Sequence, residues 1–391
     1  MHARTRLSIG WSLATLLAAA VLGSQALADS FYLEQGDRHA IGGGFSLSLG
    51  DRGLTVHKAG RRAPVLIDGA HPAHAVSVDT RRDGVHLSFM PACDEVAQVY
   101  TRQQLAALLD HEEGRRLAQR GKLEEAEAAL ARAVGLAPLR YGFLLVEVRV
   151  KLGKLEEANR ALQPIVAASP LQAYVLASSD PTRRPLLELP ALAALRAPSP
   201  GSAAIDAKTL SLRGWARAPG GVLATVHAES FHGVCYTALS LELRDGASLA
   251  PLATFALATG EDASGDGCEQ PFTKAGAARV RTRVARANQV LTELGFVPLE
   301  AEVAKEPEVK ESGTQTARFA SDNLGVVVGR DGALRLFRQG KLLLERPAGT
   351  IPYEQLVGAI RVPQERRILL FSMEHGCEFA ELHAITPVPL P

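Results

Sequence analysis

The sequence has little of several residue types that accompany particular functions. Among 391 residues there are four cysteines, three methionines and two tryptophans, and aromatic residues make up only 5%. No CxxC pair occurs, so neither a zinc ribbon nor a thioredoxin-type redox site is expected. Basic and acidic residues nearly balance, at 43 against 42, which leaves no basic excess to hold a phosphate backbone. We therefore expect no nucleic-acid partner.

The motifs of common enzyme classes are also missing. There is no GxSxG, HExxH or Walker A motif, and no helix signal follows the glycine run 42–44 that could make it a phosphate cradle. Two groups could suggest metal ligands: His71 with His74, and His227 with His232 and Cys235. A surface loop explains the first better, and an oxidised thiol explains the second. The sequence thus assigns no catalytic residue, no metal and no cofactor.

A long apolar run occurs only near the N-terminus. Residues 1–28 are typical of a secretory signal peptide, with Arg4 and Arg6 before the apolar run 7–22 and Ala26 and Ala28 at the cleavage positions. No later stretch reaches the roughly 18 apolar residues that a membrane helix needs. We expect cleavage after Ala28 and export to the periplasm or the exterior, with no membrane span after cleavage. The alternative is a retained anchor.

An even number of cysteines in an exported chain favours disulfides. Cys93, Cys235, Cys268 and Cys377 allow three pairings, and the spacing does not choose among them. A Cys235–Cys268 bond would close a loop that contributes about 3–4 kcal/mol through chain entropy. Cys93 and Cys377 would then pair only if the β-rich regions that contain them touch.

The middle of the chain contains a repeat. The hexapeptide GKLEEA occurs at 121–126 and again at 153–158, an offset of 32 residues that is typical of stacked supersecondary units. Apolar residues follow each copy at helical spacing, through Leu130 in the first and Leu162 in the second. Pro138 and Pro170 then end these helices at equivalent places. Helical hairpins are predicted over 102–198.

This pattern resembles the tetratricopeptide repeat (TPR) family over about residues 103–197. The resemblance assigns helix packing to Gly114, Leu117, Gly121, Ala126, Leu130, Ala133 and Pro138, and in the second repeat to Gly153, Ala158, Leu162 and Pro170. The second repeat departs from the family, because Val146 replaces a small residue and Arg149 replaces a large apolar one. Residues 171–197, broken by prolines, are expected to form short helices that cap the array.

The resemblance implies a groove for a protein or peptide rather than catalysis. Its inward positions would be His111, Glu112, Arg115, Gln119, Arg140, Phe143, Glu147 and Lys151. Arg115, Arg140 and Lys151 could together hold a ligand carboxylate, because guanidinium geometry matches a carboxylate. The alternative is an ordinary solvated face.

Three regions, 29–101, 199–298 and 317–391, predict antiparallel strands through alternating apolar residues and turn signals. The stretch 326–337 aligns with 47–57 when Gly329 and Gly332 are placed on Gly50 and Gly53. We hypothesise that the outer two regions are related β units and that the middle region is a looser relative. Residues 299–316 lack a steady period and predict a linker.

The middle region ends in a predicted helix over 276–296, which Gly295 terminates. Its apolar stripe comprises Val280, Val284, Ala287, Val290, Leu291 and Leu294. The opposite face carries Arg279, Arg281, Arg283 and Arg286. A basic face of this kind meets acidic lipid or a partner, or is simply solvated.

Together these features predict an α+β multidomain protein: a short TPR-like α-hairpin array flanked by antiparallel β-rich units, after a cleaved signal peptide. The favoured function is an exported, non-enzymatic scaffold that binds a protein or peptide. The alternatives are a hydrolase-like envelope enzyme with a site in the β portion, and a purely structural envelope component.

Overall fold

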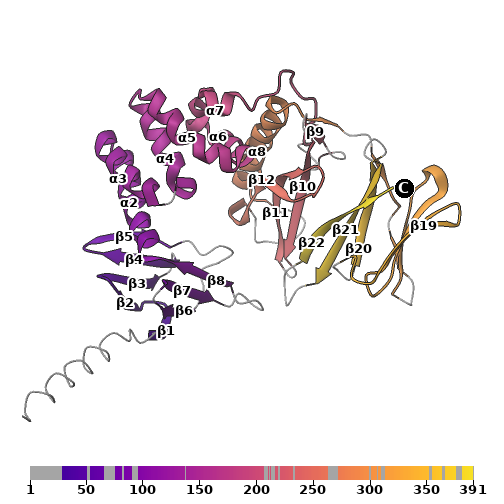
Figure 1. Ribbon diagram of the computed structural model, residues 1–391, viewed down its shortest axis with the longest axis horizontal. Helices are drawn as coiled ribbons and strands as arrows, with labels where there is room; N and C mark the ends of the chain where they lie inside the picture. The colour runs from indigo at the N-terminus through magenta and orange to yellow at the C-terminus, as the bar shows by residue number, and fades with distance from the viewer. Residues whose placement is uncertain are drawn as a thin grey trace, which may run out of the picture. The chain divides into compact units, whose positions relative to one another are not determined.

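The computed structural model describes residues 29–50, 53–65, 75–81, 83–89, 96–136, 138–206, 210, 212, 216–218, 221–231, 234–262, 272–298, 301–305, 307–309, 313–351, 355–362, 366–375 and 381–390. It contains helices and five antiparallel sheets (Figure 1), in agreement with the predicted α+β class. The chain divides into two compact units, Met1–Leu152 and Gly153–Pro391. Each unit is described separately below.

The N-terminal unit begins with two packed sheets, which we call the N-terminal sandwich. One sheet has the order β2-β3-β4-β5: Arg38–Gly42, Phe45–Gly50, Gly53–Lys58 and Arg61–Pro64. The other has the order β1-β6-β7-β8: Asp29–Glu34, Ala75–Thr80, Val85–Phe89 and Val96–Tyr100. The inward residues of both sheets belong to one buried apolar cluster.

The predicted alternation is confirmed in strand β3. Phe45, Leu47 and Leu49 are buried, whereas the serines between them lie on the opposite face. Leu47 pairs with Val56 of β4, which is also buried. Because side chains alternate between the two faces of a strand, this register leaves one polar face of the sheet open.

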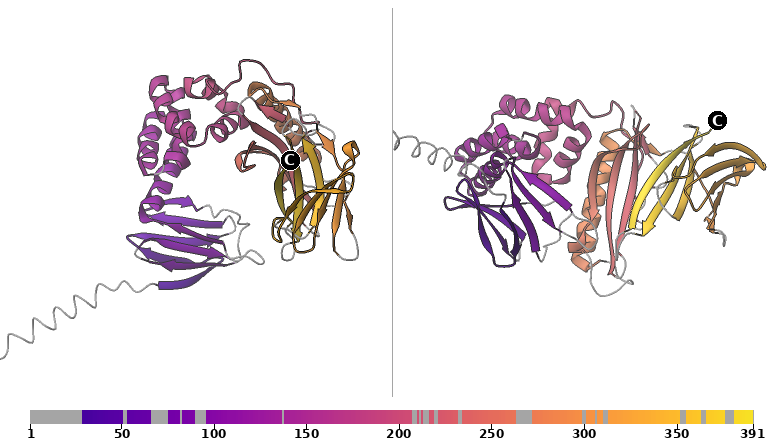
Figure 2. Two further views of the ribbon diagram at one scale, coloured as in Figure 1. Left: turned by 45° about the vertical axis from the view of Figure 1, so that its right-hand side comes forward. Right: turned by 60° about the horizontal axis from the view of Figure 1, so that its bottom comes forward.

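Three helices complete the N-terminal unit: α2 (Arg102–Gln119), α3 (Leu123–Leu136) and α4 (Pro138–Lys151). Thr101 and Gln104 form a capping box, in which each side chain accepts a hydrogen bond from the other's backbone nitrogen. Leu105 and Leu109 of α2 enter the same buried cluster as the strands, and α2 lies against β5 (Figure 2). The first helix of the repeat therefore belongs to the core of the sandwich.

The second unit opens with α5 (Leu155–Ala168), α6 (Pro170–Ser179), the 3₁₀ helix η1 (Pro181–Glu188) and α7 (Pro190–Ala193). Short helices were predicted over 171–197 from the proline density, and α6, η1 and α7 confirm this prediction. Pro138 and Pro170 begin the following helices α4 and α6, where a missing backbone N–H is harmless. The boundary between the units falls at Leu152, between the two helices of the second repeat.

The middle region forms one sheet with the order β12-β11-β10-β9-β13. The strands are β9 (Ala216–Ala218), β10 (Val222–Phe231), β11 (Val234–Asp245), β12 (Pro251–Ala258) and β13 (Val297–Pro298). Helix α8 (Lys274–Glu293) packs beside β12 (Figure 2), and all six residues of its predicted apolar stripe are buried. Because the described residues here form one sheet with a helix rather than two sheets, the middle region does not share the architecture of the outer regions.

The C-terminal region again has two packed sheets. One has the order β14-β20-β21-β22: Glu302–Val303, Gln355–Val362, Arg367–His375 and Glu381–Pro389. The other has the order β15-β16-β17-β18-β19: Glu308–Val309, Gln315–Arg318, Leu324–Val328, Leu334–Arg338 and Lys341–Arg346. The stretch 299–316, expected to be a linker, thus supplies strands β14 and β15, which pair with β20 and β16.

The two outer regions share a strand order. In each, the first strand joins the sheet of the last three strands (β1 with β6-β7-β8, β14 with β20-β21-β22), and a meander forms the second sheet. The predicted alignment, which placed Gly329 and Gly332 on Gly50 and Gly53, is however wrong by one residue for the strand that follows the turn. Val328 pairs with Leu334 where Leu49 pairs with Leu54, because the C-terminal turn is longer. A one-residue slip would move every later side chain to the opposite face.

Candidate functional site

The residues of the predicted groove lie on α2 and α4 of the N-terminal unit. The rings of His111 and Tyr141 connect the two helices, with 4.8 Å between their centroids. Arg115, Gln119 and Lys151 are exposed, whereas His111, Phe143 and Glu147 are half-buried. The side chain of Arg140 lies outside the described residues. Helices α2 and α4 thus lie in contact, and the residues named here present both polar and aromatic groups.

Arg115 already has a carboxylate partner on its own helix. Its Nε and Nη2 donate to the two carboxylate oxygens of Glu112, at 2.8 Å each, and Arg116 Nε donates to Glu112 at 3.0 Å. Burial alone would raise the pKa of Glu112, but the hydrogen bonds and charges of the two arginines outweigh it and lower this pKa. A ligand carboxylate would have to compete with Glu112 for Arg115.

Ion pairs fasten α2 to its neighbours. Arg61 of β5 donates to Asp110 at 2.8 Å and to Glu113 at 3.2 Å, and Arg132 of α3 approaches Asp110 at 3.3 Å. Asp110 is thus shared by an arginine of the sandwich and an arginine of the next helix. These contacts add directional restraint to the apolar core that α2 and the strands share.

The residues assigned to helix packing show why small side chains are required. A Cβ added at Gly114 would lie 2.5 Å from Cγ of Leu130 and 3.2 Å from the carbonyl of Ala126. Gly121 and Gly153 adopt positive φ angles of 76° and 75° where α2 and α4 end. Of the remaining positions, Ala126, Leu130, Ala133, Ala158 and Leu162 are fully buried, Leu117 is half-buried, Pro170 is exposed, and the side chain of Pro138 lies outside the described residues.

Arg149 stands where the TPR pattern has a large apolar residue, and its contact with α3 is polar. Instead of an apolar contact, its Nε donates to Glu127 of α3 at 2.9 Å, with both side chains largely shielded from solvent. Val146, in place of a small residue, is fully buried in α4. The α3–α4 junction is therefore joined partly by an ion pair.

Several predicted groups cannot be placed. Cys93, Cys268, Cys377, His71, His74 and His232 lie outside the described residues, as does the side chain of Cys235 in β11. Within the described ranges, no three His, Cys, Asp or Glu side chains come together in a way that could hold a metal ion. The disulfide pairings remain predictions.

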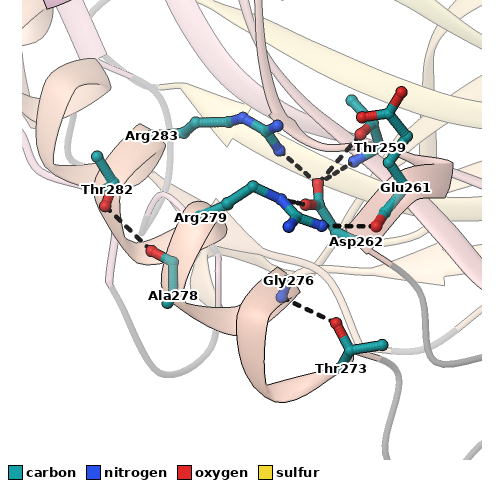
Figure 3. Close-up of polar contacts among 9 residues, drawn as sticks. All are labelled: Thr259, Glu261, Asp262, Thr273, Gly276, Ala278, Arg279, Thr282 and Arg283. Atoms are coloured by element: carbon teal, nitrogen blue, oxygen red, sulfur yellow. Dashed lines mark hydrogen bonds and ion pairs between the residues drawn. The ribbon is translucent and has the colours of Figure 1, made fainter.

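Two of the α8 arginines reach a carboxylate of the same protein (Figure 3). Arg279 Nε donates to Asp262 at 2.7 Å, and Arg283 donates to the other carboxylate oxygen of Asp262. Arg286 donates to the carbonyl of Ser179 in α6 at 2.6 Å. Three of the four arginines thus make intramolecular contacts. Arg279 and Arg281 are exposed, whereas Arg283 and Arg286 are half-buried.

Asp262 ends the 3₁₀ helix η2 (Gly260–Asp262) and has no solvent exposure. Thr259 donates to it from its backbone nitrogen at 2.9 Å and from its hydroxyl at 3.1 Å (Figure 3). Burial opposes ionisation, but the hydrogen bonds from Arg279 and Arg283 prevail and lower the pKa of Asp262 to about 2. A paired, fully buried carboxylate of this kind joins β12 to α8.

Sequence reasoning missed Glu112, Glu127 and Asp262 as partners of arginines. For Glu112 a signal was present, since Arg115 and Arg116 follow it at i+3 and i+4 on one helix. Arg279 and Arg283 are also one turn apart, but their carboxylate lies 17 and 21 residues earlier in the chain. No local spacing could have identified that acid.

None of the helices in the described part of the chain has the length and apolar character needed to span a bilayer. Comparison with known proteins found no matching family model, no matching curated protein and no matching solved structure.

Proposed function

We propose that this chain is a non-enzymatic scaffold that binds a protein or peptide through the surface of α2 and α4. The surface comprises His111, Gln119, Phe143, Glu147 and Lys151, and it resembles the ligand groove of a TPR array. Its polar side chains would orient an extended or helical segment, and the half-buried Phe143 would supply apolar contact.

The observation that carries this proposal is the double role of α2. Leu105 and Leu109 pack in the core of the N-terminal sandwich, while Gly114 packs against Leu130 of α3. The Arg61–Asp110 ion pair adds a second restraint. Because the helix is fixed on two sides, the α2–α4 surface is preorganised, and a preorganised surface loses less conformational entropy on binding.

Site-specific photocrosslinking tests the proposal. A photoreactive residue is placed at Gln119 or Lys151 in the mature protein and illuminated in envelope extract, with Glu124 of α3 as the matched exposed control. We expect a discrete protein adduct from both groove positions and none from Glu124. Equal adducts from Glu124, or none from the groove positions, would contradict the proposal.

Export is proposed from residues 1–28 alone and needs its own test. When the full chain is expressed in a bacterial host and the cells are fractionated, the exported product should begin at Asp29. Signal peptidases cleave after a small residue such as Ala28. Substitution of Ala28 with Arg should leave an uncleaved precursor. A native product that retains Met1 would argue for the anchored alternative.

A further inference from the structure

A second surface lies on the open face of the β2-β3-β4-β5 sheet. Its register places side chains from all four strands on that face: Arg38, Ser46, Ser48, Thr55, His57 and Arg62. Arg38 and Arg62 are exposed, and the other four are half-buried. We call these six residues the basic face.

The basic face is connected by hydrogen bonds across the strands. Arg38 Nε donates to the hydroxyl of Ser46 at 3.0 Å, and the hydroxyl of Ser48 lies 2.8 Å from Nε2 of His57. Arg62 is paired with His57 in the strand register. Neighbouring strands lie about 4.8 Å apart, so the two arginines stand at the ends of a row about 14 Å wide.

The positive charge of Arg38 and Arg62 is not balanced within these four strands. The four strands contain no Asp or Glu, and among the described residues no ion pair joins the Arg38 or Arg62 side chain to a carboxylate. The nearby Arg61 points to the other side of the sheet, where it meets α2. Burial, and then the charges of Arg38 and Arg62, lower the pKa of His57. His57 is therefore a neutral donor or acceptor between two cations at neutral pH.

The C-terminal region provides an internal comparison. Its corresponding sheet has the same meander, but the matching face carries Val327, Phe337 and Leu342. Of the two arginines described on that face, Arg318 is exposed and Arg335 is paired with Glu345 at 2.7 Å. The same strand order thus forms without a row of uncompensated arginines. The basic face is a property of this sheet and is not required by the architecture.

We propose that the basic face binds a carboxylated polysaccharide. Guanidinium groups at the ends of the row match carboxylates, and the hydroxyls of Ser46, Ser48 and Thr55 can both donate to and accept from sugar hydroxyls. A membrane surface would require more basic residues or an apolar group to insert, and the face has neither. A peptide that adds a strand to a sheet binds the backbone groups of an edge strand, whereas these are side chains on the face of the sheet. Binding at this face would be independent of the α2–α4 surface.

Calorimetric titration of the full mature protein with oligogalacturonate tests the proposal. We expect saturable binding at low salt, and at least a 10-fold loss of affinity in the double variant Arg38→Gln, Arg62→Gln. The matched control is Arg335→Gln on the equivalent C-terminal sheet, which should bind like the parent. Circular dichroism establishes that each variant is folded.

Two further probes distinguish the source of the carboxylates. Oligoglutamate with the same number of carboxylates should bind at least 10-fold more weakly, since it lacks sugar hydroxyls, and vesicles rich in anionic lipid should not bind. Ring NMR signals of His57 should shift with oligogalacturonate, and its pKa should rise as bound carboxylates offset the two arginines. Absence of glycan binding, equal binding of oligoglutamate or vesicles, or unchanged affinity in the double variant would each overturn the proposal.

Discussion

Replacing Asp262 with Asn should destabilise the Gly153–Pro391 unit measurably. The pKa of Asp262 falls from 3.8 to about 2 in the folded protein, and each pKa unit corresponds to about 1.4 kcal/mol. The ionised carboxylate therefore stabilises the folded state by about 2 kcal/mol at neutral pH. The substitution also leaves Arg279 and Arg283 without their charged partner. We expect a loss of about 2–3 kcal/mol, because Arg279 remains partly exposed and recovers some hydration.

Urea denaturation and calorimetry of parent and variant would measure this loss. In a unit of this size it corresponds to a decrease in Tm of about 4–10 °C. Because the folded-state pKa is depressed, the stabilisation is present above the unfolded pKa of about 3.8 and disappears as the pH falls toward 2. The difference between parent and variant should thus shrink by about 1 kcal/mol between pH 5 and pH 3.

Arg281→Gln, at an exposed position of the same helix, serves as the control and should change stability by less than about 0.5 kcal/mol. If Asp262→Asn is as stable as this control at pH 7, or if its deficit does not vary with pH, the assigned role of Asp262 is refuted.

Two further predictions concern the helices. Gly114→Ala should lower the free energy of unfolding by about 1–3 kcal/mol, since its Cβ would collide with Leu130. Gly135→Ala in α3 has open space and should raise the free energy of unfolding by up to about 1 kcal/mol. Equal effects of the two substitutions in urea denaturation would contradict the close approach of α2 and α3. A double-mutant cycle with Glu127→Gln and Arg149→Met should give a coupling of about 1 kcal/mol, and additivity of the two changes would show that the ion pair contributes nothing.

The local pattern of apolar residues was sufficient to predict many of the strands and helices and the faces that they bury. The alternation around Leu47 and the stripe around Val284 predicted which faces are buried, and both are confirmed. Side-chain direction within a strand or helix repeats at a fixed period, so it can be obtained from one segment alone. The pattern did not predict turn length. The alignment of the two outer regions failed at a turn that contains one extra residue in the C-terminal region.

The candidate sites were only partly foreseeable. The positions that line α2 and α4 followed from the resemblance, but the pairing of Arg115 with Glu112 did not. The basic face was missed because Arg38, His57 and Arg62 come from three strands separated by turns. Only the register of those strands places the three side chains on one face.

By itself the sequence determined the helices, most of the strands and the faces that they bury, because hydrophobic periodicity is a property of neighbouring residues. Tertiary structure decided how distant segments meet: β1 joins β6 across an intervening sheet, α2 enters the sandwich core, and Asp262 receives two arginines from a later helix. These choices depend on the closure of long loops and on the competition among many similar arginines and carboxylates, which no local spacing encodes.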